Sequence, residues 1–159
     1  MIDNKSAHPA IKPMTGLELQ AARRAAADRF YQIGISYVPE GYTVKFRKNL
    51  TGVHRGSLRQ IEAPQPVTRK SLYIFLHECA HAHLHGSGSK LPVHVKELQA
   101  EKWAHSKMRE HGIPVPRSMT ERAKAYVAWK IDRAKKRGAK SINPEAQRFA
   151  SPRKMKTSH

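Results

Sequence analysis

The pattern of apolar and polar residues predicts a series of helices interrupted by a short β-rich segment. Residues 1–14 show no apolar period and contain two prolines, so a flexible arm is expected there. A first helix is expected over 17–32, because Thr15 can cap it and Glu18 stands at the spacing of a capping box. Three β-like stretches separated by turn-prone residues follow it, at 35–38, 42–47 and 56–63.

The strongest helix signal covers 69–85 and includes the apolar run LYIFL. Thr68 can cap this helix, and Gly86 stands where helices commonly end. A glycine- and serine-rich turn comes next. A third helix is expected from near Pro92 to about His111, before a glycine and a proline.

A fourth helix is expected to begin with Ser118 and Glu121 as a capping box and to end at Gly138. Residues 139–159 are basic and poor in apolar side chains, and are expected to form a mobile tail. The length of 159 residues fits one domain, placed at 15–138. The order of elements predicts an α+β fold: an N-terminal helix, a small sheet of about three strands, the helix over 69–85, and two further helices.

A metal-binding motif, His77-Glu78-Cys79-Ala80-His81, lies inside the strongest predicted helix. A spacing of four residues is about one helical turn, so both imidazoles project from one face and can bind one Zn²⁺. Glu78 is offset around the helix and can act as general base on a water that the zinc activates. This HExxH pattern therefore predicts a zinc hydrolase with Glu78 as its catalytic residue.

A catalytic zinc requires a third protein ligand, and the downstream sequence offers several. His85 lies two turns from His77, too far along the axis to complete a tight tetrahedron. His94 stays open as an alternative ligand. Glu97 is favoured, because Glu97 and Glu101 are four residues apart on an otherwise core-like helix face and need partners there. A metal would serve Glu97, and the free N–H of a ligand histidine would serve Glu101.

These motifs resemble the gluzincins, zinc peptidases that use HExxH and a downstream glutamate, and more narrowly the ImmA/IrrE-type metallopeptidases. The second motif of that family, E-x-E-A-[N/D]-x-F-A, is here Glu97-x-Gln99-Ala100-Glu101-x-Trp103-Ala104. Gln99 and Glu101 depart from it, and the match spans about 50 to 110. The resemblance implies a minimal zincin domain that cleaves a DNA-associated or regulatory protein. It also implies that the stretch 56–63 is the sheet edge that receives a substrate segment.

The motif is also similar to that of SprT-like proteases, which act on proteins bound to DNA. Those enzymes use a third histidine, usually followed by glycine, where this chain has His94-Val95. This resemblance ranks second. A third interpretation is a non-catalytic, basic nucleic-acid-binding protein that keeps the zincin fold.

The charge of the chain indicates which partners it can bind. It has 30 Lys and Arg against 12 Asp and Glu, and a net charge of +18. Such a chain attracts polyanions, of which nucleic acid is the commonest. The fourth helix and the tail concentrate the positive charge, and the residues predicted to contact nucleic acid are Arg133, Lys135, Lys136, Arg137 and Lys140.

Other features limit the setting and the chemistry. No apolar run is long enough to span a membrane, and Cys79 is the only cysteine, so a cytoplasmic protein without disulfides is expected. Tyr73 and Tyr126 are both candidates to stabilise an oxyanion, and the sequence does not select between them. The aromatic side chains of Trp103, Tyr126 and Trp129 are expected to lie in the core.

Overall fold

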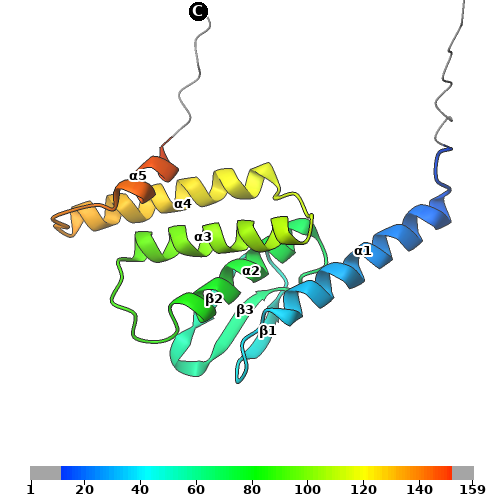
Figure 1. Cartoon of the computed structure of the whole chain (residues 1–159), viewed down its shortest axis with the longest axis horizontal. Helices are drawn as coiled ribbons and strands as arrows, with labels where there is room; N and C mark the ends of the chain where they lie inside the picture. The colour runs from blue at the N-terminus through cyan, green and yellow to red at the C-terminus, as the bar shows by residue number, and fades with distance from the viewer. Residues whose placement is uncertain (1–11, 152–159) are drawn as a thin grey trace, which may run out of the picture.

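The computed structural model describes residues 12–151, and within them it has the predicted α+β fold. The helices and strands are α1 (Gly16–Ser36), β1 (Thr43–Arg47), β2 (Val53–Arg55), the short 3-10 helix η1 (Gly56–Leu58), β3 (Gln60–Pro64), α2 (Arg69–Leu84), α3 (Val93–Glu110), α4 (Arg117–Lys136) and α5 (Pro144–Ala150). Figure 1 shows them in layers, with the sheet below α2, then α3, and α4 with α5 above. The predicted arm and tail lie in part outside the described residues, at 1–11 and 152–159.

The sheet has three strands in the order β1-β3-β2, with β3 at its centre. β3 pairs in parallel with β1 and antiparallel with β2, so that Ile61 faces both Val44 and His54. The expectation of a free edge at 56–63 is therefore wrong, because 56–58 form η1 and β3 is bonded on both sides. The sheet edge next to α2 is β2, a strand of three residues that was not predicted because it is too short for alternation to reveal it.

Helix α2 lies between the sheet and α3 and is buried on two sides. Towards the sheet, Phe75 and Cys79 pack against the fully buried Ile61 and Ala63. The other side of α2 joins residues of α1, α3 and α4 in a second cluster, which contains Leu72, Tyr73, Leu76, Ala104, Met108 and Met119. Apolar burial on both sides fixes the rotation of α2 about its axis, and with it the direction of the histidines.

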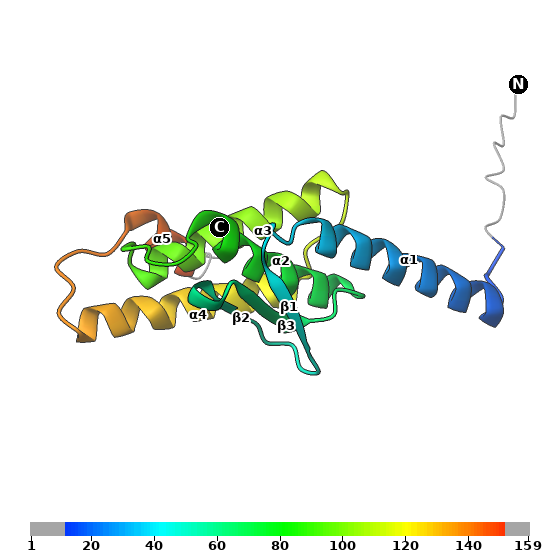
Figure 2. The same cartoon turned by 90° about the horizontal axis from the view of Figure 1, so that it is seen from below.

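Helix α1 is longer than predicted and replaces the expected strand at 35–38. Its capping box of Thr15 and Glu18 is present, but the helix runs on to Ser36. Gly34 lets the last turn of α1 pack closely against Pro66, because a Cβ on Gly34 would lie 2.7 Å from Cγ of Pro66. Ile35 then packs against the sheet cluster from the helix end without strand pairing. Figure 2 shows the N-terminal half of α1 projecting from the rest of the fold, where residues 16–25 are all exposed.

The C-terminal part differs from the prediction at both of its helices. α4 begins after Pro116 without a side-chain cap, so the capping box expected from Ser118 and Glu121 is not used. Residues 139–151, placed by sequence in the tail, contain α5, which is capped by the side chain of Asn143. Ala146 of α5 is fully buried in a cluster with Leu98, Val127 and Ile131. Seven residues are too few for apolar periodicity to reveal such a helix.

No described helix is both long enough and apolar enough to cross a membrane.

Candidate metal centre

Helix α2 sets the spacing of the two motif histidines. Its first turn is fixed by Thr68, whose hydroxyl accepts a hydrogen bond from the backbone N–H of Ser71. His77 and His81 follow the buried apolar run and are themselves partly buried. Their Nε2 atoms lie 3.1 Å apart. The cap and the buried run thus bring two imidazole nitrogens to one point beside α3.

Helix α3 brings Glu97 to the same point. Its Oε2 lies 3.1 Å from Nε2 of His77, and its Oε1 lies 3.5 Å from Nε2 of His81. Ala100 and Ala104 are fully buried, and their small side chains let α3 approach α2 closely. Burial acts to raise the pKa of Glu97, but contacts with the two imidazoles outweigh it and hold the pKa well below its usual range.

The three residues fit a tetrahedral metal ion. One ligand atom from each of His77, His81 and Glu97 lies within 4.8 Å of the others. Ligands at zinc distances stand roughly 3.3–3.6 Å apart in a tetrahedron, close to the separations given above. Two imidazole nitrogens and a carboxylate oxygen that face one another need a cation or protons between them. His77, His81 and Glu97 could therefore hold a metal ion, and all three line the cleft.

The outer nitrogen of His81 is held by a chain of neutral groups. Nδ1 of His81 lies 3.0 Å from Nδ1 of His85, and Nε2 of His85 lies 2.9 Å from Oε1 of Gln99. Because the Gln99 oxygen can only accept, His85 carries its proton on Nε2 and has a lone pair on Nδ1. Nδ1–H of His81 then donates to that lone pair. When the His81 imidazole is neutral, the chain therefore selects the tautomer with an unprotonated Nε2, the form that binds a metal.

The outer nitrogen of His77 faces Glu101, the residue predicted for this position. Nδ1 of His77 lies 2.7 Å from Oε1 of Glu101, although the contact is not aligned as a hydrogen bond. Burial raises the pKa of Glu101 to about 8. Three further buried polar atoms nearby have no hydrogen-bond partner among the described residues, namely Tyr73 Oη, Glu101 Oε2 and His105 Nε2. The surroundings of His77 are thus less fully bonded than those of His81.

Glu78 is the buried carboxylate next to the ligands. It lies in the cleft wall and is only 7% exposed. Burial raises its pKa to about 7, with the charge of Glu97 adding to the shift and that of His81 opposing it. Gly52 packs directly against Glu78, since a Cβ on Gly52 would lie 2.5 Å from Oε1 of Glu78. The glycine leaves just enough room for this carboxylate, a constraint that no local sequence pattern indicated.

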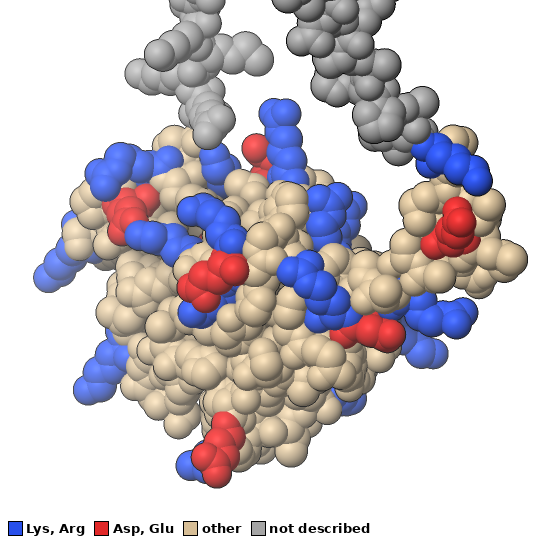
Figure 3. Space-filling view, turned by 45° about the vertical axis from the view of Figure 1, so that its right-hand side comes forward, with Lys and Arg blue, Asp and Glu red and all other residues tan. Residues whose placement is uncertain are grey.

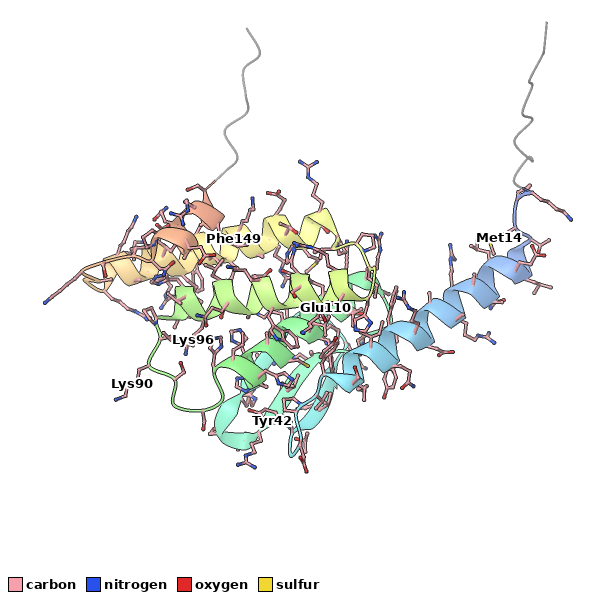
Figure 4. The ribbon with its side chains drawn as sticks, in the orientation of Figure 1. Met14, Tyr42, Lys90, Lys96, Glu110 and Phe149 are labelled. Atoms are coloured by element: carbon pink, nitrogen blue, oxygen red, sulfur yellow. The ribbon has the colours of Figure 1, made fainter. Side chains whose placement is uncertain are left out.

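The site opens into a cleft of about 750 Å³ between the sheet and α4. Residues 50–54 form one wall and α4 forms the other, and Nη1 of Arg122 ties the two by donating to the carbonyl oxygen of Leu50 at 2.9 Å. Lys96, near the N-terminal end of α3, lines the cleft as well (Figure 4). Tyr126 of α4 also lines it, and burial followed by the charges of Glu97 and Glu78 raises the pKa of its phenol.

The structure does not bring the alternative ligand His94 to the metal ligands. Its side chain is 3% exposed, and its Nε2 accepts a hydrogen bond from the backbone N–H of Asn143 at 3.3 Å. It lines a different hollow, next to α4. His83 is also turned away, because its Nε2 contacts the carbonyl oxygen of Tyr37 and its ring stacks on Trp103. Cys79 is fully buried, and burial raises the pKa of its thiol.

The residues predicted to contact nucleic acid divide into two groups. Arg133 and Arg137 line the hollow beside α4, whereas the other three, Lys135, Lys136 and Lys140, are exposed and do not line it. The expectation that Tyr126 and Trp129 lie in the core is wrong, because they are 42% and 47% exposed. The core side of α4 is instead a row spaced by four residues, Met119, Ala123, Val127 and Ile131.

Comparisons of the chain with protein-family models, with curated proteins and with solved structures find no match. The resemblance to gluzincins therefore stays a prediction from the motifs. What the site can do is indicated by the geometry of the two histidines, Glu97 and Glu78.

Proposed function

We propose that the protein is a zinc-dependent metallopeptidase in which His77, His81 and Glu97 hold the metal and Glu78 is the general base. One observation carries the proposal. Three ligand atoms converge from α2 and α3, and a buried carboxylate whose pKa is raised to about 7 lies beside them in an open cleft. Perturbed carboxylates concentrated in a cleft are a mark of catalytic sites.

The chemistry divides between the metal and the protein groups. Zinc at this site would supply a Lewis acid that polarises a carbonyl and makes water acidic enough to attack near neutral pH. Glu78 takes the proton from the attacking water and then delivers it to the leaving amine. Without a metal, burial raises the pKa of Glu78 to about 7, and the charge of a bound zinc ion would lower it towards the carboxylate form that accepts a proton.

Tyr126 is the better of the two candidate oxyanion donors. Its hydroxyl belongs to an exposed side chain in the cleft wall, and its raised pKa keeps the phenol protonated and able to donate. Tyr73 also lines the cleft, but its hydroxyl is fully buried and its side chain belongs to the core cluster of α2, so it is less accessible than that of Tyr126.

The position of strand β2 favours a polypeptide as the substrate. Val53 and His54 line the cleft, and β2 pairs only with β3 among the described strands. An extended peptide can add to such an edge through main-chain hydrogen bonds, which hold it without regard to most of its side chains. The resemblance to ImmA/IrrE-type enzymes points in the same direction, towards a DNA-associated or regulatory protein. The SprT-like alternative is less well supported, because it needs His94 as the third ligand.

The test is metal content by elemental analysis on the full chain, after loading with zinc and removal of the excess. We expect about one zinc per chain in the wild type, with loss in His77→Ala and in Glu97→Ala. His83→Ala is the matched control, a histidine of the same helix that is turned away from the site, and it keeps its zinc. A wild-type protein that holds no stoichiometric metal would rule the proposal out.

Activity is then measured on a labelled disordered protein such as fluorescent casein. Cleavage by the wild type that disappears in Glu78→Gln supports the peptidase. Tight zinc binding without cleavage of any unfolded substrate would instead indicate a regulatory zinc protein.

A further inference from the structure

Helix α4 carries a second surface that borders the proposed peptidase cleft. Tyr126, Lys130, Arg133 and Arg137 follow one another at spacings of four, three and four residues, so they share one side of the helix, and Trp129 lies beside them. Val127 and Ile131 of the apolar core row follow Tyr126 and Lys130 by one residue, about 100° round the helix, so the core row lies on the adjoining side of α4. The aromatic and basic side chains therefore border the core row, and the rings of Tyr126 and Trp129 remain exposed.

The cations on this surface gather around the aromatic rings. Nζ of Lys130 lies 4.8 Å from the centroid of the Trp129 ring and 5.1 Å from that of Tyr126. The guanidinium of Arg133 lies 4.9 Å from the Trp129 centroid. Trp129 nevertheless stays 47% exposed. A large apolar ring is thus partly open to solvent, with the cations of Lys130 and Arg133 lying over it, and a base that stacks on a face held by a cation would displace that cation.

A hollow of about 480 Å³ lies next to Trp129. One side of it is formed by Trp129, Lys130, Arg133 and Arg137, and the other by the start of α3 with the segment after α4. Among the described residues, no acidic side chain lines it. Pockets for small organic groups range over roughly 300–1,000 Å³, so a nucleobase with its sugar has room here.

We propose that this surface binds single-stranded nucleic acid, with a base stacked on Trp129 and the backbone phosphates on Lys130, Arg133 and Arg137. Stacking on an exposed ring combined with a positively charged groove is how proteins bind single strands without reading sequence. The net charge of +18 favours a polyanion, and Figure 3 shows Lys and Arg side chains over much of the upper part of one face.

The exposed ring of Trp129 distinguishes a single strand from other polyanions as the expected ligand. A duplex keeps its bases stacked inside, so it could use the cations but not Trp129. An acidic polypeptide would also use the charges and gain little from a flat ring. A bound strand would lie close to the metal cleft, because Val93 lines both hollows and the rings of Tyr126 and Trp129 are 5.8 Å apart.

The experiment measures binding of the full chain to a labelled oligo-dT of about 12 nucleotides by fluorescence anisotropy, beside a duplex of equal length. Stacking of one base contributes about 1–3 kcal/mol, so Trp129→Ala should weaken binding of the single strand roughly 5- to 150-fold and leave duplex binding unchanged. Trp129→Phe, which keeps a ring, should restore most of the affinity. Phe46→Ala removes a similarly exposed aromatic side chain from β1 and should have no effect.

Salt dependence tests the phosphate contacts. Replacing both Arg133 and Arg137 by alanine should lower the slope of log affinity against log salt by about 1.4, two contacts at roughly 0.7 each. Lys135→Ala combined with Lys136→Ala removes the same charge from the same helix outside the hollow, and should change the slope by less than half as much. The proposal is overturned if Trp129→Ala binds oligo-dT like the wild type, or if poly-glutamate competes as well as oligo-dT at equal charge.

This inference does not depend on the peptidase. His77→Ala, which removes a proposed metal ligand, should bind oligo-dT like the wild type. Failure of the zinc experiment and failure of the nucleic-acid experiment can therefore be told apart.

Discussion

The sheet and the metal cleft both bury acidic side chains, and they treat them in opposite ways. In the sheet, Glu62 of β3 is 7% exposed and accepts hydrogen bonds from Arg47 and Arg55 on the two neighbouring strands, with contacts of 2.8 and 2.9 Å. Hydrogen bonds from Arg47 and then Arg55 lower its pKa to about 2. This carboxylate is charged and compensated, and its role is to hold three strands together.

The cleft buries Glu78, Glu97 and Glu101, and among the described residues none of them forms an ion pair with Lys or Arg. In a chain with 30 basic residues and 12 acidic ones, arginine or lysine partners would be easy to supply. Burial instead raises the pKa of Glu78 and of Glu101, and of the three only Glu97, which contacts the two imidazoles, has its pKa lowered. Carboxylates left without cationic side chains reduce stability, which is characteristic of residues kept for binding or catalysis.

The largest expected effect on activity comes from replacing Glu by Gln in the cleft, compared with the same replacement in the sheet. Glu78→Gln should lower kcat/KM for peptide hydrolysis about 10²- to 10⁴-fold, because it removes the general base. Its zinc content should stay at the wild-type level, since Glu78 is not a ligand. Glu62→Gln is the matched control and should keep its activity. Equal activity of Glu78→Gln and the wild type would show that Glu78 is not the general base and that it does not differ in this respect from Glu62.

The next effect concerns the space around Glu78. In Gly52→Ala, the new Cβ would lie 2.5 Å from Oε1 and 2.6 Å from Cγ of Glu78, so the carboxylate must move. A displacement of about 1 Å of a catalytic group can cost on the order of 100-fold in rate, and we expect a loss of activity of that size with zinc retained. Gly16→Ala, at a glycine with no atom near the added Cβ, is the control. An unimpaired Gly52→Ala enzyme would show that Glu78 tolerates another position.

A smaller effect is expected from the neutral chain behind His81. His85→Ala removes the acceptor for Nδ1–H of His81 and should weaken zinc binding about 10- to 100-fold, as loss of an outer partner of a ligand histidine does. Gln99→Leu should act in the same direction. Gln99→Glu keeps an acceptor for His85 and should bind zinc much more tightly than Gln99→Leu. Competition with a chromophoric chelator measures each affinity, with His83→Ala as control. If His85→Ala matched the wild type, the chain would have no part in metal binding.

Local spacing explains how much of the cleft could be predicted from the sequence. His77, Glu78 and His81 share one helix, so the helical repeat alone fixes their relative placement, and the same holds for Glu97 and Glu101. Gly52 and the pairing of His85 with Gln99 depend on how a loop and α3 approach α2, and no local pattern encodes that. The sequence cannot exclude His94 as a ligand for the same reason, since its contact with Asn143 depends on the packing of the chain after α4.

In the fold too, features set by local sequence are predicted, and features set by packing between elements are not. The α+β class and the capped helices α1 and α2 follow from local signals. The strand expected at 35–38 fails because its apolar residues are buried from the end of α1, and β2 is too short for alternation to be detected. On α4, residue type favours the core for the rings of Tyr126 and Trp129, whereas the helical spacing places them outside the buried row.

The smallest effect concerns stability in the sheet. The pKa of Glu62 in the folded protein, about 2, lies below its usual value of 4.5, so the folded state favours the charged form. Its contribution to stability is complete above pH 4.5 and is lost as the pH falls from there towards about 2. Glu62→Gln lacks this contribution and should have a lower denaturation midpoint than the wild type at pH 7.

The difference between Glu62→Gln and the wild type should shrink as the pH is lowered from 4.5, because the wild-type carboxyl itself becomes neutral. Urea unfolding of the metal-free proteins at several pH values measures it. Glu18→Gln, at an exposed helix cap, serves as the control for loss of one negative charge. A difference between Glu62→Gln and the wild type that did not change with pH would mean that packing of the side chain, and not its charge between two arginines, holds the strands. The contrast with the cleft would then rest on the metal ligands alone.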